Sequence, residues 1–259
     1  MDMKNTITEK NDMASHAKDK KIKNLSYTTE LTNDNKDFFH GHRARERKRL
    51  LTTPFGKVSK RDLLEVMLYH CNARSDTKPI ADNILKYTQG SVHKVLFFEE
   101  NDIKNIKGLG ESFLCLTRTM RELMSTSFYE ELETESTFAS WDCVKSYIKI
   151  NMSHLNVEHF RMLVLGNNNQ LIKDCLLSQG TVNHASVYVR EIVKVTLENF
   201  GVSVILAHNH PSGDVTPSRS DIEITQNIVK ALNTITVRVQ DHFIVGVNEI
   251  YSFADNNLL

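Results

Sequence analysis

The spacing of apolar residues divides the chain into two parts. Between residues 59 and 130, apolar residues recur every three or four positions in short stretches that start near Ser59, Thr77 and Ser91. This spacing is typical of amphipathic helices, and a Ser or Thr at each start can cap the first turn. The sequence therefore predicts several short helices around a small core.

The second part, from residue 138 onward, alternates between helical and strand-like patterns. The expected elements are a helix with Trp141 inward, a hairpin of Val157–Leu165 and Leu171–Leu177, a helix over Ser186–Phe200, a strand over Val202–Leu206, a helix after Asp221, and strands over Val237–Val247 and Ile250–Phe253. This order predicts an α/β sandwich built on a mixed sheet.

Composition sets the boundaries of these parts. Residues 1–37 are polar and carry no apolar pattern, so we expect a disordered tail. Residues 131–137 are acidic and also lack apolar periodicity, which predicts a linker. This linker would join a helical domain of residues 38–130 to an α/β domain of residues 138–259.

Overall composition indicates a soluble, cytoplasmic protein. Of its 259 residues, 40% are apolar and 25% are charged, and the formal net charge is zero, so overall charge gives no reason to expect a nucleic-acid or membrane partner. There is no apolar run long enough to cross a bilayer and no secretory signal. The cysteines are widely spaced without a Cys-x-x-Cys pair, which predicts small core residues and no disulfides: Cys71, Cys115, Cys143 and Cys175.

Two stretches of the helical part are candidates for contact with DNA. Gly41–Leu50 carries five cations against one anion, which suits either a phosphate-binding patch or a solvated helix face. Ile103–Gly110 resembles the hairpin of a helix-hairpin-helix module, whose glycines expose backbone N–H groups to a phosphate. Glu111 follows the second glycine and would repel a phosphate, so a hairpin kept for packing or protein contact is an equal alternative.

The strongest candidate chemistry lies just after the strand expected over Val202–Leu206. His208 and His210 are two residues apart near the end of an extended segment, so both imidazoles can point to one position. Pro211 and Gly213 then turn the chain. The spacing predicts that two metal ligands come from one turn.

A third ligand is expected from the helix that follows. Asp221 lies one turn before Ile224, which begins a helical apolar series, and should face inward. Ser218-x-x-Asp221 is also an ordinary helix cap, and the same spacing occurs at Ser59-x-x-Asp62 with no histidine nearby. Two imidazoles and one carboxylate leave the fourth position of a tetrahedral zinc open for water, which is the arrangement of a catalytic zinc site.

These residues resemble a known signature. His-x-His-Pro followed by Ser-x-x-Asp is similar to the JAMM motif of the JAB/MPN metalloprotease superfamily, and Leu206–Asp214 resembles the form found in RadC-like proteins. Similar stretches extend over about residues 38 to 255 and include Glu158–Phe160, Gly180–Thr181, Ala185–Tyr188, Arg190–Glu191 and Asp241–Gly246. The chain departs from the pattern at Val189, where such proteins usually carry proline.

The resemblance implies a cytidine-deaminase-like JAB/MPN fold and a zinc-dependent hydrolase that cleaves peptide or isopeptide-like bonds in a protein or peptide substrate. His208, His210 and Asp221 would hold the Zn²⁺ ion. Glu158 would act as the proton shuttle, and the hydroxyl of Ser218 would stabilise the oxyanion.

Other features bear on this assignment. Strand alternation puts Glu158 on the same face as Phe160 and Met162. Asp241 and His242 are candidates for the partners that orient the histidine ligands.

An alternative function is that of a DNA-associated accessory protein, which would bind DNA through residues 38–130. A zinc nuclease is disfavoured, because a site with one carboxylate ligand lacks the paired, carboxylate-bridged ions common in phosphodiester cleavage.

Overall fold

The computed structural model describes the chain from residue 38 onward, with three short gaps. The described residues are 38–73, 75–135, 141–180 and 185–259. The predicted tail, residues 1–37, lies outside them. The chain divides into two compact units, residues 1–45 and 46–259. Of the first unit the structure describes only the beginning of helix α1, which runs over Phe38–Thr52.

Short helices make up the first part of the larger unit. They are α2 (Lys60–Cys71), α3 (Lys78–Tyr87), α4 (Val92–Val95), α5 (Glu100–Asn105) and the long α6 (Glu111–Thr134). The predicted starts at Ser59 and Ser91 are confirmed, because each hydroxyl accepts a hydrogen bond from the backbone N–H three residues later. Leu68, Ile84 and Phe113 are fully buried in the core of this part. None of the described helices is both long and apolar enough to cross a membrane.

The predicted hairpin lies between α5 and α6. Its first glycine, Gly108, has a φ of +98°, which L side chains rarely adopt. A Cβ there would lie 2.7 Å from Cδ1 of Ile80, so close packing also requires glycine. Gly110 precedes α6 in an extended conformation, and Glu111 is the first helical residue. The hairpin therefore has a packing role that is independent of any DNA contact.

The predicted linker is wrong for residues 131–134, which belong to α6. Leu132 is fully buried in the core of the α/β part, and Phe128 and Tyr129 pack against the same cluster. Together these three side chains form an apolar stripe at helical spacing within an otherwise acidic run. The stripe anchors the end of α6, whereas residues 136–140 lie outside the described chain.

Eight elements of the described chain form the α/β part. They are α7 (Trp141–Met152), β1 (His159–Leu165), β2 (Leu171–Gln179), α8 (Ala185–Glu198), β3 (Ser203–Asn209), α9 (Arg219–Asn233), β4 (Arg238–Val245) and β5 (Ile250–Ser252). The strands form one sheet in the order β2-β1-β3-β4-β5. Strands β3 and β4 are parallel, and the other neighbouring pairs are antiparallel. The predicted mixed sheet is confirmed.

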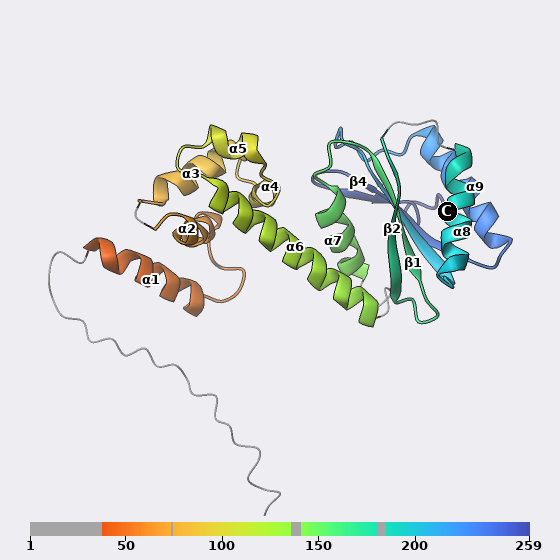
Figure 1. Cartoon of the computed structure of the whole chain (residues 1–259), viewed down its shortest axis with the longest axis horizontal. Helices are drawn as coiled ribbons and strands as arrows, with labels where there is room; N and C mark the ends of the chain where they lie inside the picture. Colours follow the sequence, from red (N-terminus) through yellow and green to blue (C-terminus); the bar gives the residue numbers. More distant parts are fainter. Residues whose placement is uncertain (1–37, 74, 136–140, 181–184) are drawn as a thin grey trace, which may run out of the picture. The chain divides into compact units, whose positions relative to one another are not determined.

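Helices cover both faces of this sheet (Figure 1). Helix α7 packs on one face through Val144 and Ile148. Helices α8 and α9 pack on the other face through Ile192 and Ile228. Strand β3 lies at the centre of the sheet and all seven of its residues are buried, which explains its continuous apolar run.

One irregularity in β4 changes which of its residues face each side of the sheet. Pairing with β3 passes from Val239 directly to Asp241, so Gln240 is an extra residue. The side chain of Gln240 is held in place, because its Nε2 donates to Oγ of Ser203 at 2.7 Å. Val239 packs on the α8–α9 side. Beyond the bulge it is His242 that faces this side, where it contacts α9.

The four cysteines are free thiols that differ in exposure. Cys143 lies in the core as predicted, and burial raises the pKa of its thiol to about 12. Cys115 is exposed on α6, so the expectation of a core residue is wrong there. Cys71 and Cys175 are half-buried.

Candidate metal centre

His208 is held near the end of the central strand β3. In the antiparallel pairing with β1 it lies opposite Phe160, and the two rings are stacked with their centroids 6.0 Å apart. The side chain of His208 is 1% exposed. The strand therefore places a buried imidazole near the C-terminal end of β3, in the middle of the sheet.

His210 follows the strand and is placed by backbone hydrogen bonds. Its N–H donates to the carbonyl of Val245 at 3.0 Å, and its own carbonyl accepts from the N–H of Gly213 at 2.9 Å. Gly213 adopts a φ of +83°, which allows this tight turn. The turn brings Nε2 of His210 to 3.0 Å from Nε2 of His208, so the two imidazoles converge as their spacing predicts.

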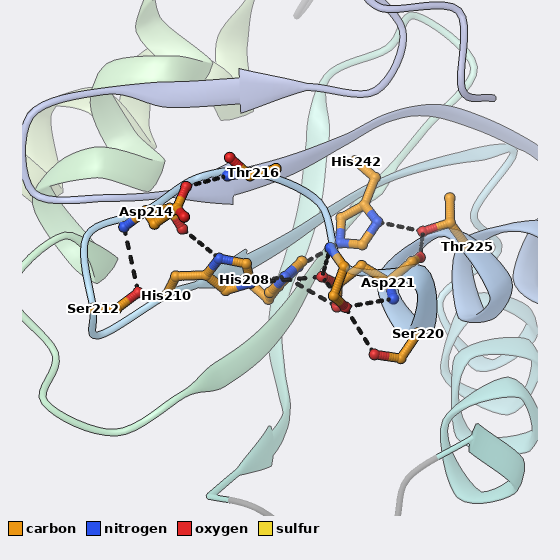
Figure 2. Close-up of polar contacts among 10 residues, drawn as sticks. His208, His210, Ser212, Asp214, Thr216, Ser220, Asp221, Thr225 and His242 are labelled. Atoms are coloured by element: carbon orange, nitrogen blue, oxygen red, sulfur yellow. Dashed lines mark hydrogen bonds and ion pairs between the residues drawn. The ribbon is translucent and has the colours of Figure 1, made fainter.

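Asp221 is placed by the cap of helix α9. Its N–H donates to Oγ of Ser218 at 3.2 Å, and its carboxylate accepts from the N–H of Ser218 at 2.7 Å. Its two carboxylate oxygens lie 3.5 Å from Nε2 of His208 and 3.6 Å from Nε2 of His210. Within the described part of the chain, these three residues form a group whose ligand atoms all lie within 4.8 Å of one another. The predicted ligand set is thus brought together (Figure 2).

In each histidine the ring nitrogen that faces away from the cluster, Nδ1, has a hydrogen-bond partner. Nδ1 of His210 lies 2.6 Å from the backbone carbonyl of Asp214 (Figure 2). A carbonyl can only accept, so Nδ1 carries the hydrogen, and in the neutral ring Nε2 directs a lone pair into the cluster. Nδ1 of His208 lies 2.8 Å from Nε2 of His242. Such outer contacts are what orients histidine ligands at metal sites.

The cluster attracts positive charge. The carboxylate of Asp221 raises the pKa of His210, although burial opposes the shift. Burial disfavours the charged form of Asp221, but the neighbouring imidazoles of His208 and His210 outweigh it and hold the pKa of this carboxyl well below its usual range. A proton or a metal ion can supply the positive charge that both shifts favour.

The donor set fits zinc. A tetrahedral zinc ion with bonds of about 2.0–2.1 Å sets neighbouring ligand atoms about 3.4 Å apart. The two imidazole nitrogens lie 3.0 Å apart, and each has a different carboxylate oxygen of Asp221 nearest to it, Oδ1 at 3.5 Å from His208 and Oδ2 at 3.6 Å from His210. With one ligand atom from each residue, the three atoms lie within 4.8 Å of one another, close enough to share one ion. Two imidazole nitrogens and one carboxylate oxygen are also a ligand set typical of catalytic zinc, which keeps a position open.

Glu158 lies beside the cluster, just before β1. The β1–β3 register ends with Phe160 opposite His208, and Glu158 precedes β1 just as His210 follows β3, so both residues lie at the same end of this strand pair. The charges agree with this placement, because Glu158 adds to the effect of Asp221 in raising the pKa of His210. Glu158 is half-buried and is not a member of the ligand group.

Ser218 combines two contacts. Its Oγ caps α9 and also donates to a carboxylate oxygen of Asp221 at 2.6 Å. Oγ of Ser220 lies 2.8 Å from Oγ of Ser218. The capping role is confirmed, and the hydroxyl lies against a ligand of the cluster, whereas its role towards an oxyanion stays a prediction.

Of the two candidates for orienting the histidines, only His242 reaches the cluster. Its ring is fully buried, and burial lowers its pKa well below the ordinary value. The carboxylate of Asp241 accepts instead from the backbone N–H groups of His242 and Ala254 and from the hydroxyl of Ser252. Asp241 therefore stabilises the end of the chain.

Thr225, which no motif in the sequence marks, also takes part in these contacts, because its hydroxyl lies 2.6 Å from Nδ1 of His242. Its spacing gave a signal, because Thr225 lies four residues after Asp221 and so on the same side of the helix.

Comparison with known families agrees with this geometry. Residues 138–258 match the model of a family described as the RadC-like JAB domain. The match begins at residue 138, where the sequence analysis placed the start of the α/β domain, and it contains every residue of the metal-ligand group. The C-terminal part of this chain, residues 138–258, belongs to the RadC-like JAB domain family.

Proposed function

We propose that the centre binds one zinc ion through His208, His210 and Asp221 and hydrolyses peptide or isopeptide-like bonds. One observation carries the proposal: two imidazole nitrogens and a carboxylate oxygen converge within 4.8 Å of one another in a cluster that attracts positive charge. The family of residues 138–258 agrees with it, since JAB domains commonly bind zinc.

The residues around the ligands supply the remaining chemistry. When bound, the ion lowers the pKa of a water molecule to about 7 and polarises a substrate carbonyl. Glu158, whose charge acts on His210, accepts the proton of the attacking water and passes it to the leaving amine. The hydroxyl of Ser218 donates its one hydrogen to Asp221 in the resting centre and turns from this carboxylate to donate to the developing oxyanion.

Glu158→Gln tests the proposal, because it keeps the shape of the side chain and removes its basicity. Elemental analysis should find about one zinc per chain in the parent and in this variant. Turnover of a fluorogenic peptide that the parent cleaves should fall by about a hundredfold to ten-thousandfold, mainly in kcat. Glu191→Gln is the matched control, since Glu191 forms an ion pair with Lys194 on α8.

Two outcomes would contradict this proposal in different ways. A parent protein without zinc, or a folded His208→Ala/His210→Ala variant with parental zinc content, would remove the metal assignment. Near-parental turnover by Glu158→Gln would place the base on another residue.

DNA binding by residues 38–130 stays a separate prediction. The α5–α6 hairpin that would offer N–H groups to a phosphate is formed, but Glu111 lies in the first turn of α6. Binding of duplex DNA by the full chain that weakens steeply with added salt would support this function.

A further inference from the structure

The two histidine ligands differ in how their tautomers are determined. His210 faces a backbone carbonyl, which can only accept a hydrogen bond. His208 faces the imidazole of His242, and an imidazole nitrogen either donates or accepts according to its own tautomer. The contact between the two rings therefore does not by itself determine which nitrogen of His208 is free for a metal.

The next contacts along this chain resolve the ambiguity (Figure 2). The hydroxyl of Thr225 lies 2.6 Å from Nδ1 of His242 and donates to the backbone carbonyl of Asp221 at 2.5 Å. A hydroxyl has one hydrogen, and here the carbonyl of Asp221 receives it. Thr225 must then accept from Nδ1–H of His242.

The direction of the hydrogen bond between His208 and His242 then follows for a neutral imidazole of His242. With its hydrogen on Nδ1, the ring of His242 accepts at Nε2 from Nδ1–H of His208, which leaves Nε2 of His208 with a lone pair. The surroundings favour the neutral ring, since His242 and Thr225 are fully buried and the ring of Phe253 stacks on His242 at 4.7 Å.

We propose that Thr225 and His242 are positioning residues, which hold His208 in the one tautomer that can bind a metal. This inference rests on the proposed zinc site. The same chain of hydrogen bonds ends on the backbone of Asp221, so it links two of the three ligands. The orientation of His208 and the position of the first turn of α9 are therefore coupled.

Substitutions at Thr225 separate this role from simple core packing. Thr225→Val keeps the volume and removes the hydroxyl, whereas Thr225→Ser keeps the hydroxyl and removes a methyl group. A packing role would make serine the more harmful change, and a positioning role would make valine the more harmful change. Thr196→Val is the matched control, because Thr196 is also fully buried and donates to the carbonyl four residues earlier, that of Ile192.

The readout is the affinity for Zn²⁺ alone, measured by competition with a chromophoric chelator. We expect Thr225→Val to weaken zinc binding by about tenfold to a hundredfold, the usual effect of losing an outer partner of a ligand. Thr225→Ser and Thr196→Val should stay within about threefold of the parent. The visible spectrum of the Co²⁺-substituted protein should change in the valine variant and be restored by serine.

A second measurement needs no substitution. In the zinc-loaded parent labelled with ¹⁵N-histidine, NMR should find the hydrogen of both His208 and His242 on Nδ1. A hydrogen on Nε2 of His242, or parental zinc affinity in a folded Thr225→Val protein, would overturn this inference and leave the zinc site standing. If the parent binds no zinc, the proposed function fails instead.

Discussion

The start of α9 and the start of α2 carry the same local motif with nearly the same geometry. At Ser218-x-x-Asp221 the hydroxyl donates to the carboxylate at 2.6 Å and accepts from the Asp N–H at 3.2 Å. At Ser59-x-x-Asp62 the corresponding distances are also 2.6 and 3.2 Å. The local sequence therefore builds the same serine cap twice, and at α9 a bond from the N–H of Ser218 to the carboxylate of Asp221 completes a capping box.

The two motifs differ in which side chains from other parts of the sequence lie beside the carboxylate. Asp62 pairs with the guanidinium of Arg49, which has only donors and holds its protons at all ordinary pH values. Asp221 meets Nε2 of His208 and His210, which can offer lone pairs. A helix cap becomes a candidate metal ligand only where the end of a strand brings such lone pairs to it.

The largest difference is expected when each carboxylate loses its charge. Asp221→Asn should weaken zinc binding by at least about a hundredfold, because it removes one of three protein ligands, and activity should fall with the metal. Asp62→Asn should keep parental zinc content, since its carboxylate faces Arg49. Chelator competition with both proteins measures this, and equal affinities would mean that the two caps do not differ in the way described.

A smaller difference is expected for the two serines. Ser218→Ala and Ser59→Ala should each lower the free energy of unfolding by about 1 kcal/mol, since each removes a helix cap. Only Ser218→Ala should also lower kcat, by about a hundredfold to a thousandfold, because only this hydroxyl lies beside the ligands. Urea unfolding and turnover are the two measurements. A kcat loss shared by both variants would point to a general effect of helix stability.

The smallest expected difference is in pH dependence, with zinc removed by a chelator. Asp221 raises the pKa of His210, so this pair stabilises the fold fully below a pH of about 6.5, the pKa of a histidine in the unfolded chain. The stabilisation is lost as the pH rises through the raised pKa of His210 in the folded protein. The lowered pKa of Asp221 keeps its own contribution present above about pH 4. The cost of Asp221→Asn should therefore shrink from pH 6 to pH 9.

Asp62→Asn provides the reference for this measurement. Its cost should stay constant over the same range, because the guanidinium of Arg49 does not change charge there. Urea unfolding at several pH values gives both differences. A cost of Asp221→Asn that grows with pH would contradict the assigned direction of the His210 shift.

The parts of the centre that depend on residues close to one another in the sequence could be predicted. The buried run of β3 and the two-residue spacing of His208 and His210 predict convergent imidazoles, and helical spacing predicts the inward position of Asp221. The position of Glu158 depends on how β1 pairs with β3, which spacing alone does not predict, so only the resemblance to a family pointed to this residue.

Contacts between distant segments could not be predicted in this way. The partner of His208 depends on β4 lying beside β3 and on the bulge at Gln240, which no local pattern announces. The end of α6 was missed for a different reason. Its apolar stripe around Leu132 is short and lies among acidic residues, whose composition resembles that of a linker.

The extra residue in β4 also decides which kind of side chain lies beside His208. If alternation continued unbroken from Val239, the carboxylate of Asp241 would lie on the side of His208, where the bulge instead sets the imidazole of His242. A carboxylate can only accept, so a chain of hydrogen bonds would end there, whereas an imidazole has a second nitrogen that passes the chain on to Thr225. One inserted residue thus connects the end of β3 to helix α9.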